Sequence, residues 1–159
     1  MKKIILSVIL SLLSTVSFAE TSGKFDASGM GSWEVNVMNA GNGNMAITYD
    51  GNAGLADKDP ESIFHKSTMN CVGGLTLTAG KFEDETGMCT FYLTDGEKVF
   101  INYKGKGTGG VDGSGDFLII GGTGKYENIS GKGFSSRQNL KGKSGLSHSM
   151  NQMSGSFTY

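Results

Sequence analysis

The sequence KFDASGMGSWEVNV, residues 24–37, alternates between two kinds of position. Every second residue is apolar or glycine, and most residues between them are polar or charged. The first set is Phe25, Ala27, Gly29, Gly31, Trp33, Val35 and Val37. A period of two that continues over such a stretch predicts one long β-strand with one buried face. The glycines in its middle indicate a bend or the close approach of another backbone.

Strands and turns are predicted along the rest of the chain as well. Short alternating or apolar stretches predict strands at 45–49, 63–78, 88–94, 99–103, 117–120, 126–136 and 153–159. Turns are predicted at Asp95-Gly96, at Asp112-Gly113 and in the glycine-rich stretch 121–124. Loops are predicted at 39–44, 51–61 and 138–148, and no segment has a helical apolar period. The chain therefore reads as about eight strands.

Length and composition fit one β domain. The chain has 159 residues with 26 glycines, one proline and 37% hydrophobic residues, which excludes a collagen and a wholly disordered protein. About eight strands in such a chain fit an up-and-down barrel or a sandwich. We favour the barrel because nearly every link is hairpin-like and a closed barrel leaves no open edge. The predicted fold is all-β, a single eight-stranded antiparallel β-barrel.

The Asp95-Gly96 dipeptide favours a two-residue type I′ turn, which sets the register of its hairpin. That register pairs Phe91 with Phe100 and Tyr92 with Val99. One face would then carry Cys89, Phe91, Leu93 and Phe100, and the other Tyr92, Val99, Ile101 and Tyr103. Both faces are apolar, so the outward set would pack on a loop, on another subunit or on a partner.

The two cysteines, Cys71 and Cys89, are placed symmetrically about Gly80. A hairpin that turns at Gly80 would place them opposite each other on antiparallel strands, within the range of a disulfide. The alternative is a redox or metal pair, but two cysteines without a third ligand make a poor zinc site. We predict a structural Cys71–Cys89 disulfide.

Residues 1–19 have the pattern of a secretory signal peptide. Lys2 and Lys3 precede an apolar stretch, and Ser17 and Ala19 place small residues at a cleavage site. The stretch is too short for a typical membrane anchor, which is the alternative. We predict cleavage after Ala19, a single barrel domain at 20–159, and a secreted or periplasmic protein without a membrane span. Removal of the two lysines leaves 12 basic residues against 15 acidic ones, so no nucleic-acid partner is expected.

The segment IIGGTGKYENISGKG, residues 119–133, resembles the glycine-rich signature of the allene oxide cyclase-like barrel superfamily, which includes plant dirigent proteins. In that signature a strand ends at a Gly-Gly-Thr-Gly turn, an aromatic residue follows, and a Ser/Thr-Gly pair lies in the next strand. The preceding region is similar to small secreted bacterial proteins with two cysteines, an Asp-Gly turn and a Val-Phe strand. Those features are here Cys71, Cys89, Asp95-Gly96 and Val99-Phe100.

This resemblance covers residues 71–133 and implies an antiparallel, calycin-like barrel with an apolar cavity. It also implies a homo-oligomer, since characterised members are dimers or trimers. Plant members cyclise an oxidised fatty acid or steer the coupling of phenolic radicals. None of their catalytic residues can be matched to this sequence, so a cyclase activity would rest on analogy of fold alone.

Catalytic and metal-binding patterns are absent or incomplete. The histidines, His65 and His148, have no recognisable triad partners. Glu83, Asp84 and Glu85 are adjacent, and neighbours in a strand point to opposite faces, so we expect a charged loop and no catalytic carboxylate pair. The acidic loop with Asp57, Asp59 and Glu61 suggests at most a weak calcium site, and the simpler interpretation is a solvated loop. We expect no cofactor and no metal.

Two functional hypotheses follow. The first is a non-catalytic barrel that binds a small hydrophobic ligand or a protein partner. The second is a cyclase or isomerase acting on a hydrophobic substrate, which convergent polar residues with shifted pKa inside the barrel would favour. By alternation, the candidate cavity residues are Trp33, Tyr49, Tyr92 and Tyr103, with core packing as their simpler role. A filled interior would exclude both hypotheses.

Overall fold

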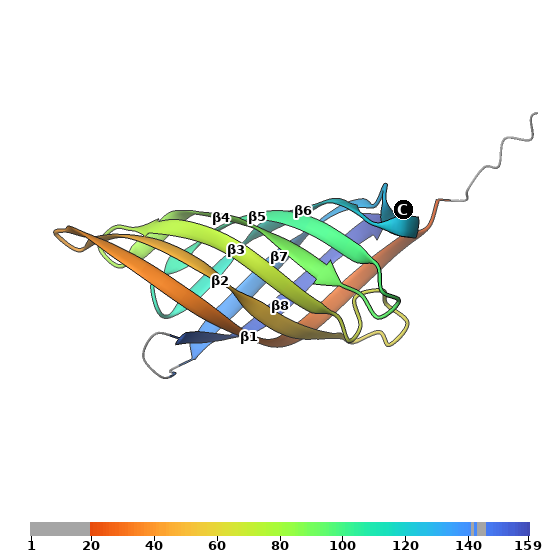
Figure 1. The fold of residues 1–159 in the computed structure, drawn as a ribbon, viewed down its shortest axis with the longest axis horizontal. Coiled ribbons are helices and arrows are strands. Elements are labelled where there is room, and N and C mark those ends of the chain that lie inside the picture. Colours follow the sequence, from red (N-terminus) through yellow and green to blue (C-terminus); the bar gives the residue numbers. More distant parts are fainter. Residues whose placement is uncertain (1–19, 141, 143–145) are drawn as a thin grey trace, which may run out of the picture.

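The computed structural model describes residues 20–140, 142 and 146–159; the predicted signal peptide lies outside these residues. Eight antiparallel strands close into a barrel in which each strand pairs with its neighbours in sequence, and β8 pairs with β1 (Figure 1). They are β1 Ser22–Gly41, β2 Asn44–Asp57, β3 Thr68–Leu77, β4 Lys81–Tyr92, β5 Lys98–Thr108, β6 Asp112–Gly122, β7 Ser130–Leu140 and β8 Leu146–Thr158. A short 3-10 helix, η1, spans Gly124–Tyr126. The prediction of a single eight-stranded antiparallel barrel is confirmed.

The polar segment 138–148 was predicted as a loop, and most of it belongs to strands. β7 continues to Leu140 and β8 begins at Leu146. Strand β1 is long enough to pair with β8 as far as Glu34, opposite Leu146. Pairing with a neighbouring strand therefore outweighs the polar composition on which the loop was based.

The β4–β5 hairpin differs from the predicted register by one residue. Phe91 pairs with Val99, and the Leu93 amide donates to the Glu97 carbonyl, so the loop holds three residues. Gly96, its last residue, has a φ of 90°, as in a three-residue loop. A slip of one residue moves a whole strand's side chains to the other face.

This register changes which β5 side chains face the lumen. Val99 and Ile101 are buried with Phe91, whereas Tyr92 is 45% exposed on the outside. The predicted division of this hairpin's side chains between its two faces is thus wrong.

The β5–β6 turn lies earlier than predicted, and strand β7 begins later than predicted. The β5–β6 turn uses Gly109 and Gly110, with a φ of 72° at Gly110, and Asp112 already pairs with Thr108. The predicted strand 126–136 begins only at Ser130, because Tyr126 belongs to η1 and is buried.

The β2–β3 loop closes one end of the barrel with Phe64. Part of this loop, from residue 63, was predicted as strand, but β3 begins at Thr68. The Phe64 ring is 1% exposed, and its centroid lies 4.5 Å from that of Phe25 and 5.2 Å from that of Phe91. Phe117 and Phe157 complete this aromatic core. One half of the barrel is therefore filled.

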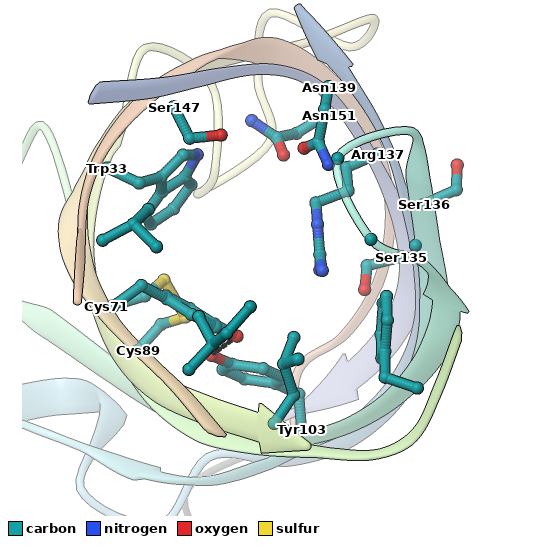
Figure 2. A pocket seen from close by; sticks show the side chains of 18 of the residues that line it. Trp33, Cys71, Cys89, Tyr103, Ser135, Ser136, Arg137, Asn139, Ser147 and Asn151 are labelled. Carbon is teal, nitrogen blue, oxygen red and sulfur yellow. Dashed lines mark hydrogen bonds between the residues drawn. A yellow bond between two sulfur atoms is a disulfide. The ribbon is translucent and has the colours of Figure 1, made fainter. Parts of the chain in front are cut away.

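The Cys71–Cys89 disulfide is present, as predicted. The two residues face each other across β3 and β4, which are joined by a turn at Ala79 and Gly80. Both are buried and point into the lumen, where Figure 2 shows the bond between their sulfur atoms.

Replacing Cys71 and Cys89 together with alanine should lower the free energy of unfolding by about 3 kcal/mol, because an unlinked unfolded chain has more conformations. Urea unfolding followed by circular dichroism measures the change. A reductant should destabilise the wild type by a similar amount and leave the double variant unaffected. A loss below about 1 kcal/mol would contradict a stabilising role for this bond.

Candidate functional site

The other half of the barrel encloses a cavity of about 430 Å³. It lies toward the end formed by the β1–β2, β3–β4 and β5–β6 turns, since Gly109 and Gly110 of the last turn line it. Its apolar wall consists of Val35, Val37, Ile47, Leu75, Leu77, Phe82 and Leu146. The volume falls within the range of about 300–1,000 Å³ that is usual for small-molecule sites.

Four side chains from four strands form a polar cluster beside this cavity: Tyr49, Glu85, Tyr103 and Arg137. The Arg137 guanidinium makes two bonds to the Glu85 carboxylate, Nη1 to Oε2 at 3.0 Å and Nη2 to Oε1 at 2.8 Å. Tyr49 Oη donates to Glu85 Oε1 at 2.5 Å and lies 2.7 Å from Tyr103 Oη. Figure 2 shows Arg137 extending from the wall into the lumen.

The hydrogen bonds of the polar cluster have a fixed direction. Tyr49 has one hydroxyl proton, and Glu85 accepts it, so Tyr103 must donate to Tyr49. The Tyr103 oxygen keeps its acceptor capacity, and Arg137 keeps N–H groups beyond the two bonded to Glu85. Because Tyr103 and Arg137 line the cavity, they can offer a ligand one acceptor and several donors.

Glu85 points inward in phase with Gly87, Cys89 and Phe91, and a β-bulge before it also turns Phe82 inward. The pairing of β4 with β5 shifts between Phe82 and Glu85, so both of these residues point inward although they are three positions apart. The expectation that the acidic run 83–85 forms a charged loop is wrong for Glu85, whose side chain is 1% exposed. Alternation counted back from Cys89 through Gly87 would have placed this carboxylate inward.

Both tyrosines of the polar cluster are held in their protonated form. Burial raises the pKa of Tyr49, and the neighbouring Tyr103 and Glu85 raise it further. Burial also raises the pKa of Tyr103 to about 12, with Glu85 adding to the shift and the Tyr49 hydrogen bond and Arg137 opposing it. These hydroxyls therefore serve as hydrogen-bonding groups around neutral pH.

Stability should fall at alkaline pH because of these two tyrosines. From pH 10, the ordinary pKa, to about 12, the unfolded state ionises Tyr103 while the folded state keeps it protonated. Each such group lowers the free energy of unfolding by about 1.4 kcal/mol per pH unit. Urea unfolding of the wild type and of Tyr103→Phe between pH 9 and about 11 should give a shallower decline for the variant. Parallel declines would contradict the assignment.

Glycines at inward positions give the polar cluster its space. A Cβ on Gly73 would lie only 2.3 Å from Tyr103 Oη and 2.7 Å from Tyr49 Oη. Other glycines lie in the same way against large side chains: Gly31 and Gly51 against Trp33, Gly105 against Glu85, and Gly113 against Arg137. Part of the high glycine content is thus explained by large side chains that cross the lumen.

Trp33 belongs to a second polar group on the cavity wall. Its indole Nε1 donates to Ser149 Oγ at 2.8 Å, and Ser149 Oγ donates to Asn151 Oδ1 at 3.0 Å. The Trp33 ring also meets Tyr49 edge-on, with centroids 6.1 Å apart. The indole N–H is thus satisfied within the protein, whereas the Asn151 amide borders the cavity.

Three of the four candidate cavity residues lie together on the cavity wall: Trp33, Tyr49 and Tyr103. Tyr92 lies outside the barrel, where Lys98 Nζ is 5.4 Å from the centre of its ring. The one-residue register difference in the β4–β5 hairpin explains this correction. Sequence reasoning missed Glu85, Arg137, Ser149 and Asn151; the alternation of β8 through Met153 would have placed the last two inward.

Among the described residues, no three His, Cys, Asp or Glu side chains gather to hold a metal ion. In the acidic loop, Asp57 and Asp59 accept backbone amides two residues further on, each at 3.0 Å. No helix within the described ranges is long and apolar enough to cross a membrane.

Comparisons with known proteins find a similarity among solved structures but none among family models or curated sequences. No protein-family model matches the chain. No curated protein sequence matches it either. Among solved structures, the chain is similar to a pterocarpan synthase dirigent protein, with 15% sequence identity and a TM-score of 0.44. That alignment covers 90% of this chain and 88% of the other.

Proposed function

We propose that the barrel binds a small, mainly apolar molecule in its cavity without transforming it. The observation that carries the proposal is the unfilled half of the lumen, with an apolar wall around the mouth and a polar cluster beside it. A filled interior would have excluded ligand binding. Apolar walls with a few fixed polar groups are typical of small-molecule sites.

The polar cluster indicates the chemistry of that molecule. Arg137 is paired with Glu85, so the cluster carries no excess positive charge for an anion. Its remaining N–H groups and the Asn151 amide suit a hydrogen-bond acceptor, such as a carbonyl oxygen. The proposed ligand is therefore neutral and apolar, with one acceptor group near Arg137.

The alternative of a cyclase or isomerase is supported by the convergence of polar groups with shifted pKa. The direction of the shifts opposes it, because an acid or base works best with a pKa near the working pH. The pKa of both cluster tyrosines is raised away from neutrality, and both Glu85 oxygens are engaged. Binding therefore suits the cluster better than proton transfer.

The proposal also covers where the protein acts and to which superfamily it belongs. We propose that residues 1–19 are a cleaved signal peptide and that 20–159 act outside the cytoplasm, where a disulfide such as Cys71–Cys89 is stable. The 119–133 signature supports placing the chain in the allene oxide cyclase-like superfamily, which also suggests a homo-oligomer.

Trp33 makes ligand binding directly measurable, since it is the sole tryptophan of the chain and lines the cavity. Prodan, a neutral naphthalene dye with one ketone, should quench Trp33 emission by energy transfer, saturating at one dye per barrel. 6-Propyl-2-dimethylaminonaphthalene keeps the three-carbon chain but lacks the ketone oxygen, and it should bind about tenfold more weakly, as expected for one lost hydrogen bond of about 1.4 kcal/mol. Quenching that never saturates would refute ligand binding in the cavity. Equal affinities for the two dyes would refute the hydrogen bond proposed for the ligand's acceptor group.

A further inference from the structure

Two methionines lie side by side on the outer surface, where β1 pairs with β8. Met30 is directly opposite Met150 in the strand register, and their exposed fractions are 62% and 55%. The next pair on the same face is Ser32 opposite His148. Two thioethers and one imidazole therefore occupy adjacent positions on one face, which we call the Met–His site: Met30, His148 and Met150.

Most neighbours of the Met–His site are glycine or polar residues. On β2, Met30 is opposite Gly54, which has no side chain, and on β7, Met150 is opposite Gln138. The following pair on this face is Ser28 with Gln152. Leu140, opposite His148 on β7, is the one exposed apolar residue among these directly paired neighbours.

Another exposed methionine provides a contrast. Met88 on β4 is opposite Val72 on β3 and Asn102 on β5, and Asn102 is in turn opposite Leu118. Val72 and Leu118 are themselves more than half exposed. Met88 thus belongs to an apolar outer surface, with neither a second thioether nor an imidazole opposite it.

His148 is held in place by Ser32. A hydrogen bond of 2.9 Å joins Ser32 Oγ and His148 Nδ1. When one ring nitrogen is fixed in this way, the other, Nε2, is the one that can bind a metal ion. Directly opposed residues have Cβ atoms roughly 5 Å apart and diagonal ones roughly 7 Å, distances that long side chains can span.

We infer that Met30, His148 and Met150 bind a soft monovalent cation, Cu(I) or Ag(I), through two Sδ atoms and Nε2. Thioether ligands favour soft cations over Zn²⁺, Ca²⁺ or Mg²⁺. Thiolates do not compete for the ion in this chain, because both of its cysteines are joined in the disulfide. Binding requires the Met30 and Met150 side chains to converge on Nε2 of the fixed imidazole, whose Cδ2–Nε2 edge lies against Gly142.

Silver ion tests this inference without redox chemistry. In the disulfide-intact protein with ¹³C-labelled methionine methyl groups, Ag(I) should shift the Met30 and Met150 signals together and saturate at one ion per chain. Met88 and Met38, which are exposed elsewhere, should not shift. Zn²⁺ should shift none of them. Equal shifts of all exposed methionines would show nonspecific thioether binding and overturn the inference.

Matched variants locate the ligands. Met30→Leu, Met150→Leu and His148→Gln should each weaken Ag(I) binding about tenfold or more in competition titrations, the scale usual for a changed metal environment. Met88→Leu is the control, because it also replaces one exposed methionine without touching the site. If His148→Gln bound as tightly as the control, the imidazole would not be a ligand. If both site leucine variants did so, the proposed site would be excluded.

Discussion

Replacing Arg137 with methionine should lower the free energy of unfolding by about 3–5 kcal/mol, because it leaves the Glu85 carboxylate buried without its cationic partner. Glu85 is 1% exposed, and Arg137 supplies two of its hydrogen bonds. Methionine has an unbranched apolar side chain that replaces the aliphatic part of arginine, so the packing of that part is largely kept. Urea unfolding at neutral pH, with the disulfide intact, measures the effect.

A second substitution tests whether the lost stability comes from the unpaired Glu85 charge or from the changed shape of residue 137. Glu85→Gln in the Arg137→Met background removes the buried charge and keeps an acceptor for the Tyr49 hydroxyl. It should restore most of the lost stability, so the two substitutions would be strongly non-additive. A single Arg137→Met variant that stays within about 0.5 kcal/mol of the wild type would show that the pair carries little of the fold's stability.

Ser135→Phe should abolish most of the binding of prodan, with a loss of affinity of about tenfold or more, since added bulk competes for a site whose apolar volume drives binding. Ser135 lies on β7 and its hydroxyl points into the lumen (Figure 2). A phenyl ring there would occupy part of the 430 Å³ cavity. Quenching of Trp33 measures the change.

The matched control is Gln138, which lies on the same strand, is exposed and does not line the cavity. Gln138→Phe therefore adds the same ring outside the lumen. Its affinity for prodan should equal that of the wild type. Equal losses in both variants would indicate a general disturbance of β7, and no loss in Ser135→Phe would place the dye elsewhere.

The strands and the disulfide could be predicted from sequence because they depend on local signals. Alternation over residues 24–37 identified β1, and the symmetric spacing about Gly80 identified the partners Cys71 and Cys89. Register depends on turn geometry, and Asp95-Gly96 is compatible with both a two-residue and a three-residue loop. The two-residue loop places Tyr92 on the same face as Tyr103, which is why Tyr92 is wrongly included among the candidate cavity residues.

The polar cluster could not be predicted for a different reason. Glu85 is in phase with the inward residues Gly87, Cys89 and Phe91, but the charged composition of 83–85 favours a loop and gives no sign of a buried carboxylate. Arg137 lies between the predicted strand 126–136 and the predicted loop 138–148, and only pairing with β8 carries it into the barrel. Alternation also tells which side chains point inward but not whether they fill the space. Only the three-dimensional structure shows that the half of the barrel around Phe64 is filled and the other half is hollow.

A barrel that holds a small apolar molecule where it acts should carry that molecule through purification. The most direct test compares native and denaturing mass spectra of the protein purified from the compartment to which its own cells export it. We expect a native mass that exceeds the chain by one discrete neutral molecule, lost on denaturation and absent from Ser135→Phe. The denatured mass also reports cleavage after Ala19, and the native mass reports the oligomeric state. A bare native protein that also fails to bind prodan would refute ligand binding.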